Sequence, residues 1–557
     1  MASKTITTTI LEHPSVGQIH GVQPQGQAHV EQYLGIQYAT LENAFARAKL
    51  VETYKSPIRA TEPGPLTVAD PKNIDNEHLL LQHSLPHPEY SFSATECLTL
   101  NVSAPSLDAR GTSAHPLPVV VFIHGGGFVT GSANWPQWDL GPLVEQSVKL
   151  DSPVIAVGIN YRLGPFGFLT SSALREAGFK ANNGLDDQKV GLRWVQKHIK
   201  GFGGDPSKVT LLCSSAGAAS GFFHLQSPEP LFSRLAAYGG SPLIQPIPLQ
   251  VSEIAYEIAT KILGIDSQPP ADQVKSLLDI PAEELSAKIG RLPVPVTAAE
   301  DGEVVRSTTS FAALADTSAL EKEFPGTEYC KPVLLGDGEF DGMVLAVTAL
   351  AARQDNLATS LRKSLETVFA DDPAKVKTIL DGYGINESNT DRDPVLNFVN
   401  DIGFAQPAKA TAEAFAAAGS RLGTSSFLAH FNMPNPWPGV WQGRATHALD
   451  IAILLGNYND FLSPGQKATS EQMSGDLLAF ANGNEPFTPY AAGGGGVAKV
   501  YQAAADAKDD ESRVVKESSE GDTGRRQILE TVAAGDPVVL DKLLGAFGLF
   551  LKGPGPK

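Results

Sequence analysis

The chain has 557 residues, of which 42% are hydrophobic and 19% charged, and its formal net charge is -18 at pH 7. This is ordinary globular composition at a length where one core usually stops growing, so we expect either several domains or one large, decorated domain. The acidic balance argues against nucleic acid as a partner, because phosphate backbones bind clustered Lys and Arg.

The beginning and the end of the chain lack the patterns of leader and membrane segments. Residues 1–22 contain Lys4, a threonine run and Glu12 but no apolar block of secretory length, so we expect no signal peptide. The apolar residues 538–551 are interrupted by charges and glycines and fall short of the roughly 20 apolar residues that cross a bilayer. We therefore predict a soluble protein without a membrane span.

The number of cysteines indicates whether the protein works in an oxidising or a reducing cell compartment. The sequence contains three of them, Cys97, Cys213 and Cys330. A sparse, odd set is a poor disulfide framework for a chain of this length. We therefore expect a reducing, cytoplasmic location.

Motifs for metal ions are absent from the sequence. There is neither a Cys-x-x-Cys nor a His-Glu-x-x-His motif, and we interpret His78, His83 and His87 as parts of a polar loop. The sequence predicts no metal and no cofactor.

The first half of the chain has the alternation of an α/β sheet. Residues 119–123 and 154–159 are short, continuous apolar runs, typical of strands buried on both faces. Helical spacing of apolar residues follows over 186–202, then a turn at 203–206 and a further strand at 209–212. This order predicts an open, mostly parallel sheet flanked by helices.

The second half predicts helical insertions between later strands. We expect helices at 345–352 and 408–418 and strands at 333–335 and 426–431. The glycines at 493–496 lack the following Lys of a phosphate-binding loop, so they indicate a flexible turn. Residues 506–526 are predicted to be a charged surface insertion. No internal repeat occurs.

A strand followed by a small-residue turn and a helix is typical of a nucleophile elbow. Such a turn occurs at 209–217 and centres on Ser215. The usual pattern, Gly-x-Ser-x-Gly, requires tiny residues because strand and helix approach closely. Gly217 fits, whereas Cys213 is larger than the expected glycine. Ser215 is our candidate nucleophile.

A glycine-rich turn at 124–128 follows the strand at 119–123. Without side chains in the way, the amides of Gly126 and Gly127 can point toward a developing oxyanion, and the amide of Ala216 supplies a third donor. These three residues form the predicted oxyanion hole.

Serine needs an imidazole as base and a carboxylate that fixes the imidazole tautomer. Of the later histidines, His224 lies in the helix after the elbow, and His447 lies in a predicted loop after the strand at 426–431, whereas His430 falls within that strand. We therefore prefer His447. The predicted acid lies in the segment 336–342, where three carboxylates compete: Asp337, Glu339 and Asp341.

Several segments together resemble the type-B carboxylesterase and cholinesterase family, with a similarity to its fungal members. The similar segments cover most of the chain: 33–39, 96–101, 124–128, 160–164, 183–188, 202–206, 336–342 and His447. The resemblance implies an α/β-hydrolase fold, with residues 1–557 as a single large domain and the active site at the bottom of a gorge. It also selects Asp341, which precedes Gly342, as the catalytic acid, with Glu339 as the alternative.

The elbow departs from the family pattern. Where the family has Gly-Glu before the serine, this chain has Cys213 and Ser214. The missing glutamate removes a negative charge, which disfavours a choline-ester specialist and lowers the pKa of the base. Cys97 matches one partner of the family's early disulfide, but no cysteine precedes it, so a free thiol is expected. A thiol nucleophile at Cys213 is disfavoured because its side chain should face away from the oxyanion donors.

The predicted function is hydrolysis of a small-molecule carboxylic ester through an acyl-enzyme on Ser215. Trp135, Trp138 and Ser214 are candidates for the substrate pocket, although structural packing explains the tryptophans equally well. The same three catalytic residues would also serve an acyltransferase, a lactonase or an amidase, and a non-catalytic interaction protein of the same fold is a further alternative. The sequence does not determine the oligomeric state or the natural substrate.

Overall fold

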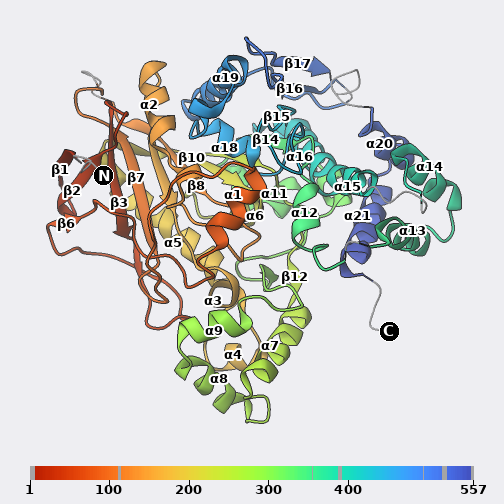
Figure 1. Cartoon of the computed structure of the whole chain (residues 1–557), viewed down its shortest axis with the longest axis horizontal. Helices are drawn as coiled ribbons and strands as arrows, with labels where there is room; N and C mark the ends of the chain where they lie inside the picture. Colours follow the sequence, from red (N-terminus) through yellow and green to blue (C-terminus); the bar gives the residue numbers. More distant parts are fainter. Residues whose placement is uncertain are drawn as a thin grey trace.

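A 13-stranded mixed sheet runs through the computed structural model of the chain (Figure 1). The structure describes residues 7–110, 115–353, 355–386, 392–493, 495–516 and 524–553. In spatial order the main strands are β1 Thr7–His13, β2 Gly17–Gln23, β3 Val30–Gln37, β7 Thr99–Pro105, β9 Ile155–Ile159, β8 Leu117–Ile123, β10 Gly204–Ser214, β11 Arg234–Tyr238, β14 Pro332–Gly338, β15 Ser425–Phe431, β16 Val497–Tyr501 and β17 Arg513–Lys516. The short strand β6 Ile58–Arg59 pairs with β2, and two small sheets pair β4 Ala39–Thr40 with β5 Lys49–Leu50 and β12 Ile247–Pro248 with β13 Ala299–Glu300.

Helices cover both faces of the sheet and extend beyond its late strands (Figure 1). The α-helices are α1 Asn73–Leu81, α2 Gly141–Lys149, α3 Gly164–Phe168, α4 Ser172–Glu176, α5 Asn183–His198, α6 Ala216–Leu225, α7 Leu249–Leu263, α8 Pro270–Asp279, α9 Ala282–Ile289, α10 Phe311–Ala315, α11 Leu320–Glu323, α12 Met343–Val347, α13 Leu357–Val368, α14 Pro373–Tyr383, α15 Asp393–Asn400, α16 Gln406–Ala417, α17 Gly419–Leu422, α18 Leu449–Leu454, α19 Pro464–Ala481, α20 Gln527–Ala533 and α21 Pro537–Lys552. Short 3-10 turns lie at Pro136–Trp138, Ile199–Phe202, Pro325–Glu328 and Asn459–Phe461, and a π-helical turn lies at Asp401–Ala405.

The middle of the sheet is parallel and its margins are antiparallel, except that the short β6 pairs with β2 in parallel. Every pairing from β9 through β8, β10, β11, β14 and β15 to β16 is parallel. The pairings among β1, β2, β3, β7 and β9, and that of β17 with β16, are antiparallel. The predicted mostly parallel sheet flanked by helices is therefore confirmed. Because the carboxyl ends of parallel strands share one edge, the loops after β8, β10, β14 and β15 lie near each other.

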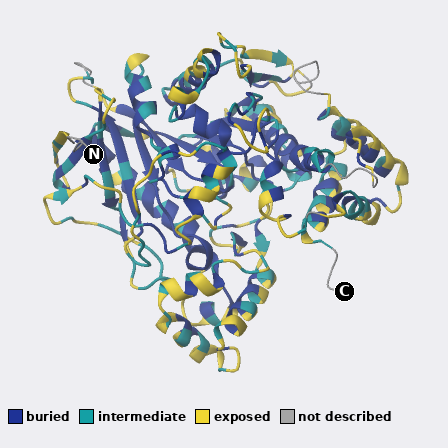
Figure 2. Ribbon diagram, viewed as in Figure 1, coloured by how far each residue is buried: buried dark blue, intermediate teal, exposed yellow. Residues whose placement is uncertain are grey.

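The strands β8 and β9 at the middle of the sheet are apolar throughout because each face of the sheet carries a layer of helices. All seven residues of β8 are buried. Alternate residues divide between two cores: Val121 packs in the core that includes α5, α6 and α16, whereas Phe122 packs in the core that includes α2, α18 and α19. Figure 2 shows these strands as buried and places exposed residues mainly on the outer helices and loops.

Two predicted boundaries are wrong. The helix expected at 345–352 is only α12, which ends at Val347; beyond it the backbone turns, and Leu350 becomes fully buried. Packing of Leu350 thus overrides the helical preference of the alanines around it. The turn expected at 203–206 is also shorter than predicted, because β10 already begins at Gly204, with an irregular pairing before Val209.

The structure describes parts of the two segments that were predicted to be surface elaboration. Residue 494 of the glycine run and residues 517–523 of the charged segment lie outside the described residues. The described part of 506–526 includes β17, an edge strand of the main sheet, and ends in Arg526, which is 7% exposed. Residues 506–516 are all exposed or partly exposed, as a surface segment would be, whereas the buried Arg526 does not fit a surface insertion.

The apolar residues 538–551 lie in α21, which packs against α10 and α13. Across the described parts of the chain, no helix is both long enough and apolar enough to cross a membrane.

Candidate active site

Ser215 lies in a sharp turn between β10 and α6. Its backbone has φ 56° and ψ -121°, a combination that L-residues rarely adopt, and its amide donates to the carbonyl of Tyr238 at 2.8 Å. A Cβ atom at Gly217 would lie 2.3 Å from the carbonyl oxygen of Ile123. The close approach of helix to strand therefore requires the glycine two residues after the serine, as the elbow pattern predicts.

Cys213 fits at the elbow because its neighbour across the turn is small. A Cβ atom at Gly221 would lie 3.3 Å from the sulfur of Cys213, so this glycine on α6 makes room for the thiol. Burial raises the pKa of the Cys213 thiol well above its usual value. A buried, protonated thiol is a poor nucleophile, and Cys213 thus belongs to the packing beneath the turn.

Three distant side chains meet at the carboxyl edge of the sheet. His447 Nε2 lies 2.8 Å from Ser215 Oγ, and His447 Nδ1 lies 2.7 Å from Asp341 Oδ1. A carboxylate only accepts hydrogen bonds, so Nδ1 carries the ring proton and Nε2 presents a lone pair to the serine hydroxyl. The second carboxylate oxygen of Asp341 accepts from the amide of Gly338 at 2.6 Å. This arrangement can withdraw a proton from Ser215 and hold the resulting imidazolium.

The competing acids of the segment 336–342 have other partners. Asp337 Oδ1 lies 2.7 Å from Nδ1 of His430, and its other oxygen accepts from Arg526. Glu339 forms ion pairs with Arg444 and with Arg525, at 3.1 and 3.3 Å. Asp341 alone among the three contacts His447 in the described residues.

The remaining histidine considered from the sequence, His224, lies near the end of α6. Its Nε2 lies 2.9 Å from Oε1 of Gln188, and burial lowers its pKa to about 3. His224 is therefore a neutral, structural side chain.

The glycine turn after β8 presents free amides beside Ser215. Gly126 and Gly127 have φ values of 97° and 61°, and a Cβ atom at Gly125 would lie 2.8 Å from that of Ser215. In the described part of the chain, no group accepts a hydrogen bond from the amides of Gly126, Gly127 or Ala216. These donors are thus available to an oxyanion next to the serine.

An aromatic stack supports the glycine turn. The rings of His124 and Tyr161 lie 4.5 Å apart, and the Tyr161 hydroxyl donates to the His124 carbonyl at 2.9 Å. Burial lowers the pKa of His124 to about 4, so the ring is neutral at pH 7. His124 therefore fixes the backbone of the turn and carries no charge into the site.

Two carboxyl groups that the sequence did not reveal act on His447 electrostatically. Asp450 lies three residues after it, and Glu77 comes from α1; burial raises the pKa of each to about 7. Burial alone would lower the pKa of His447, but the hydrogen bond and charge of Asp341, together with the charges of Asp450 and Glu77, raise it above 6.5. Asp450 could have been found from its spacing, whereas no sequence signal connects Glu77 with residue 447.

The three residues predicted to line the pocket are all buried. Trp135 and Trp138 are each 3% exposed and pack in the core with α2, α18 and α19, and Trp138 Nε1 donates to Glu77 Oε1 at 3.0 Å. Ser214 ends β10 and is 3% exposed. Through Glu77, Trp138 is linked to the surroundings of His447, and Trp135 packs in the core.

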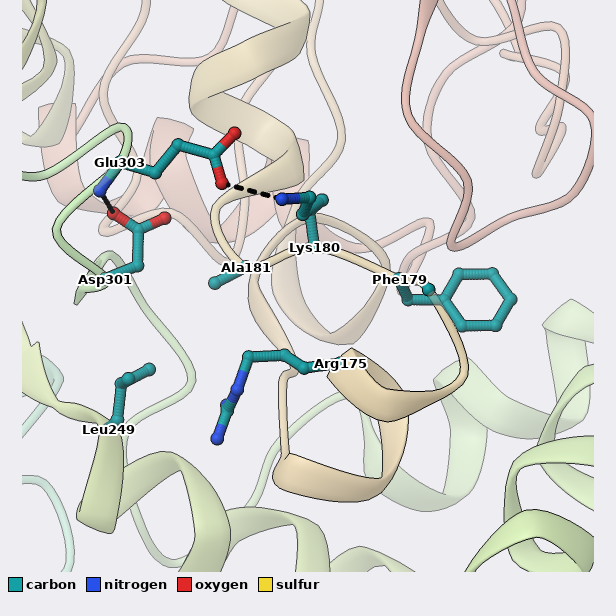
Figure 3. Close-up of a pocket in the computed structure, with 8 residues that line it drawn as sticks. Arg175, Phe179, Lys180, Ala181, Leu249, Asp301 and Glu303 are labelled. Carbon is teal, nitrogen blue, oxygen red and sulfur yellow. Dashed lines mark hydrogen bonds and ion pairs between the residues drawn. The ribbon is translucent and has the colours of Figure 1, made fainter.

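A cavity of about 160 Å³ lies elsewhere, between the segment after α4 and residues 301–303 (Figure 3). Its charged lining residues have partners within the protein: Lys180 Nζ lies 3.0 Å from Glu303 Oε2, Arg175 binds Glu253 at 2.8 Å, and Asp301 accepts from backbone amides of 303–305. Its lining contains none of the predicted catalytic residues.

Comparisons with known proteins reveal similarity along most of the chain. Residues 3–522 match the model of the carboxylesterase family. Secreted lipase 5 of Gibberella zeae is 26% identical over 486 residues, which are 82% of each protein. Para-nitrobenzyl esterase of Bacillus subtilis is 43% identical over 137 residues, 25% of this chain and 26% of that protein. A solved structure of PNB esterase superposes with a TM-score of 0.70 at 24% identity, covering 94% of this chain and 100% of the other, which confirms the fold.

Proposed function

The chain belongs to the carboxylesterase family and is a serine ester hydrolase, and we propose that Ser215, His447 and Asp341 perform the hydrolysis. The observation that supports these assignments is the continuous line of two hydrogen bonds, 2.8 and 2.7 Å long, from Ser215 through His447 to Asp341. Its substrates are small-molecule carboxylic esters.

In the first step Ser215 Oγ attacks the ester carbonyl while Nε2 of His447 takes the hydroxyl proton. Asp341 holds the ring in the tautomer that leaves Nε2 unprotonated, and it stabilises the imidazolium that forms. The imidazolium then gives the proton to the leaving alcohol, and the acyl group remains bound to Ser215.

The developing oxyanion is stabilised by the amides of Gly126, Gly127 and Ala216. Each such donor is worth about 3 kcal/mol in the transition state, because it is already oriented before charge develops. Gly125 leaves room beside Ser215, because a Cβ atom there would lie 2.8 Å from the Cβ atom of the serine.

In the second step a water molecule takes the place of the alcohol. His447 removes one of its protons, the hydroxide attacks the acyl-enzyme, and the proton returns to Ser215 as the acid leaves. An alcohol acceptor would use the same base and the same oxyanion donors, so hydrolysis and acyl transfer differ only in the nucleophile that reaches the acyl-enzyme.

The neighbouring serines Ser214 and Ser215 provide a matched test. A fluorophosphonate probe should label the wild type and Ser214→Ala at one site, identified as Ser215 by peptide mass spectrometry, and should not label Ser215→Ala. We expect Ser215→Ala to lose roughly 10⁶-fold in kcat for a short-chain aryl ester while Ser214→Ala stays within tenfold of the wild type. Labelling of Ser215→Ala, or its retention of wild-type turnover, would show that another residue is the nucleophile.

We also propose that residues 1–557 form one catalytic domain located in the cytoplasm. The single large sheet, which extends from β1 to β17, supports the first point, and the three free, buried cysteines support the second. The name of the similar Gibberella protein favours secretion instead. Cell fractionation decides: recovery of the protein in the culture medium contradicts the cytoplasmic assignment.

A further inference from the structure

Of the three histidines that we expected in a polar loop, His83 and His87 lie in the loop after α1, but His78 lies on the helix itself. His78 lies on α1 and is 1% exposed, three residues after Asp75 on the same helix. His87 follows in the next segment. One ligand atom from each of Asp75, His78 and His87 lies within 4.8 Å of the other two. The third histidine, His83, stacks on Trp437 and is not part of this cluster.

Gln137 determines which nitrogen of His78 is free. Oε1 of Gln137 lies 3.0 Å from Nε2 of His78, and Nε2 of Gln137 faces the carboxylate of Glu77. The amide oxygen can only accept, so Nε2 of His78 carries the proton and Nδ1 carries a lone pair. Within the described residues, this buried Nδ1 has no hydrogen-bond partner. A buried, unpaired acceptor is unfavourable unless a cation or a donor occupies the space in front of it.

His87 is oriented in the complementary way. Its Nδ1 lies 3.0 Å from the carbonyl oxygen of Pro88 and must donate to it, so in the neutral ring Nε2 has the lone pair. That nitrogen lies 3.5 Å from Oδ1 of Asp75. Two acceptors that face each other at this distance repel unless a proton or a metal ion lies between them.

We propose that Asp75, His78 and His87 bind one divalent transition-metal ion of the zinc type. Two imidazole nitrogens and a carboxylate oxygen are ligands that zinc prefers, and each neutral ring has its other nitrogen held by an oxygen acceptor, as metal-binding histidines usually do. Tetrahedral ligands at about 2.0–2.2 Å from zinc lie roughly 3.3–3.6 Å apart, close to the separation of His87 Nε2 and Asp75 Oδ1. The Asp75 side chain is 65% exposed, so water can supply the fourth ligand.

The ion would fasten α1 to the segment that carries His87. Gln137 then links the site to the surroundings of the catalytic base, since the amide that orients His78 also faces Glu77, whose charge acts on His447. The metal ion itself lies outside the predicted catalytic residues and takes no part in the hydrolysis; its effect is to hold α1 in place.

Zinc binding to the full chain tests the proposal. After dialysis against EDTA, calorimetric titration with ZnCl₂ should show one equivalent bound to the wild type and to Ser215→Ala. We expect at least tenfold weaker binding for His87→Ala and for Asp75→Ala, both of which change exposed residues, and wild-type binding for His83→Gln, the matched neighbouring histidine. Thermal unfolding should shift upward with zinc only in the proteins that bind it.

Gln137→Leu separates a built site from a chance grouping of side chains. This change removes the acceptor that sets the His78 tautomer and should weaken zinc binding by about 10–100-fold without removing a ligand. Circular dichroism checks that each variant keeps the fold. The proposal is overturned if the wild type takes up no zinc at one equivalent, or if His87→Ala and Asp75→Ala bind zinc as tightly as the wild type, because a His87 to Asp75 ion pair would then account for the geometry.

Discussion

Two imidazole and carboxylate pairs lie at the carboxyl ends of β14 and β15. His447 with Asp341 and His430 with Asp337 are both buried, and in both the Nδ1 to Oδ1 distance is 2.7 Å. They differ in the third partner: the other nitrogen of His447 faces the hydroxyl of Ser215, whereas Arg526 lies against the ring of His430 and also binds Asp337. A histidine paired with a carboxylate is thus a candidate general base only where a nucleophile contacts its other nitrogen. Where a guanidinium contacts the pair instead, the pair has a structural role.

Substituting each of the two histidines separately is the strongest test of this comparison. His447→Ala should lower kcat by roughly 10⁶-fold, because among the described residues His447 is the one base that contacts the hydroxyl of Ser215. His430→Gln should leave kcat/KM within tenfold of the wild type and lower the melting temperature. Steady-state kinetics on an aryl ester and thermal unfolding measure the two effects; a loss of activity in His430→Gln as large as that in His447→Ala would remove the distinction between the pairs.

Replacing the two carboxylates should show the same contrast between activity and stability, with a smaller loss of activity. Asp341→Asn should lower kcat by about 10⁴-fold, since an amide can donate to Nδ1 and so favours the wrong ring tautomer. Asp337→Asn should retain activity but lower the free energy of unfolding by roughly 3 kcal/mol, because it removes a buried charged partner of Arg526. Urea unfolding beside kinetics distinguishes the two, and equal stability of Asp337→Asn and the wild type would contradict the structural role.

The pH profile tests the electrostatics around His447. The base must be neutral to accept a proton, and its pKa is raised above 6.5, so kcat/KM should be full at high pH and fall as the pH drops through that raised pKa. Asp341 is the main cause of the increase and Asp450 a lesser one. Asp450→Asn should therefore move the midpoint to lower pH and change kcat/KM at pH 8 by less than tenfold.

The control for the pH dependence of kcat/KM is His430→Gln. The midpoint of its pH profile should match that of the wild type, because His430 does not contact Ser215. A midpoint below 6.5 in the wild type, or an unchanged midpoint in Asp450→Asn, would mean that the nearby charges do not act on the base as the geometry indicates.

Local pattern made the strands, the elbow and the glycine turn predictable. The continuous apolar runs at 119–123 and 154–159 became β8 and β9, and Ser215 lies between a strand and a helix as its small neighbours indicated. Each of these features depends on residues within a few positions of one another. Family resemblance was needed to choose Asp341 over Asp337 and Glu339, since all three share one loop. The catalytic roles themselves remain predictions.

The sequence by itself determined where the strands lie and which turns and polar residues follow them. Apolar runs, glycines and small turn residues constrain the backbone locally. Only the tertiary structure decided which partners those residues meet: Arg526 with Asp337, Gly221 beneath Cys213, Glu77 near His447, and His78 beside His87 and Asp75. These contacts join positions far apart in the chain or on opposite sides of a turn, so they depend on how helices pack on the sheet. The electrostatics of a buried group follow from such contacts, and no local pattern contains them.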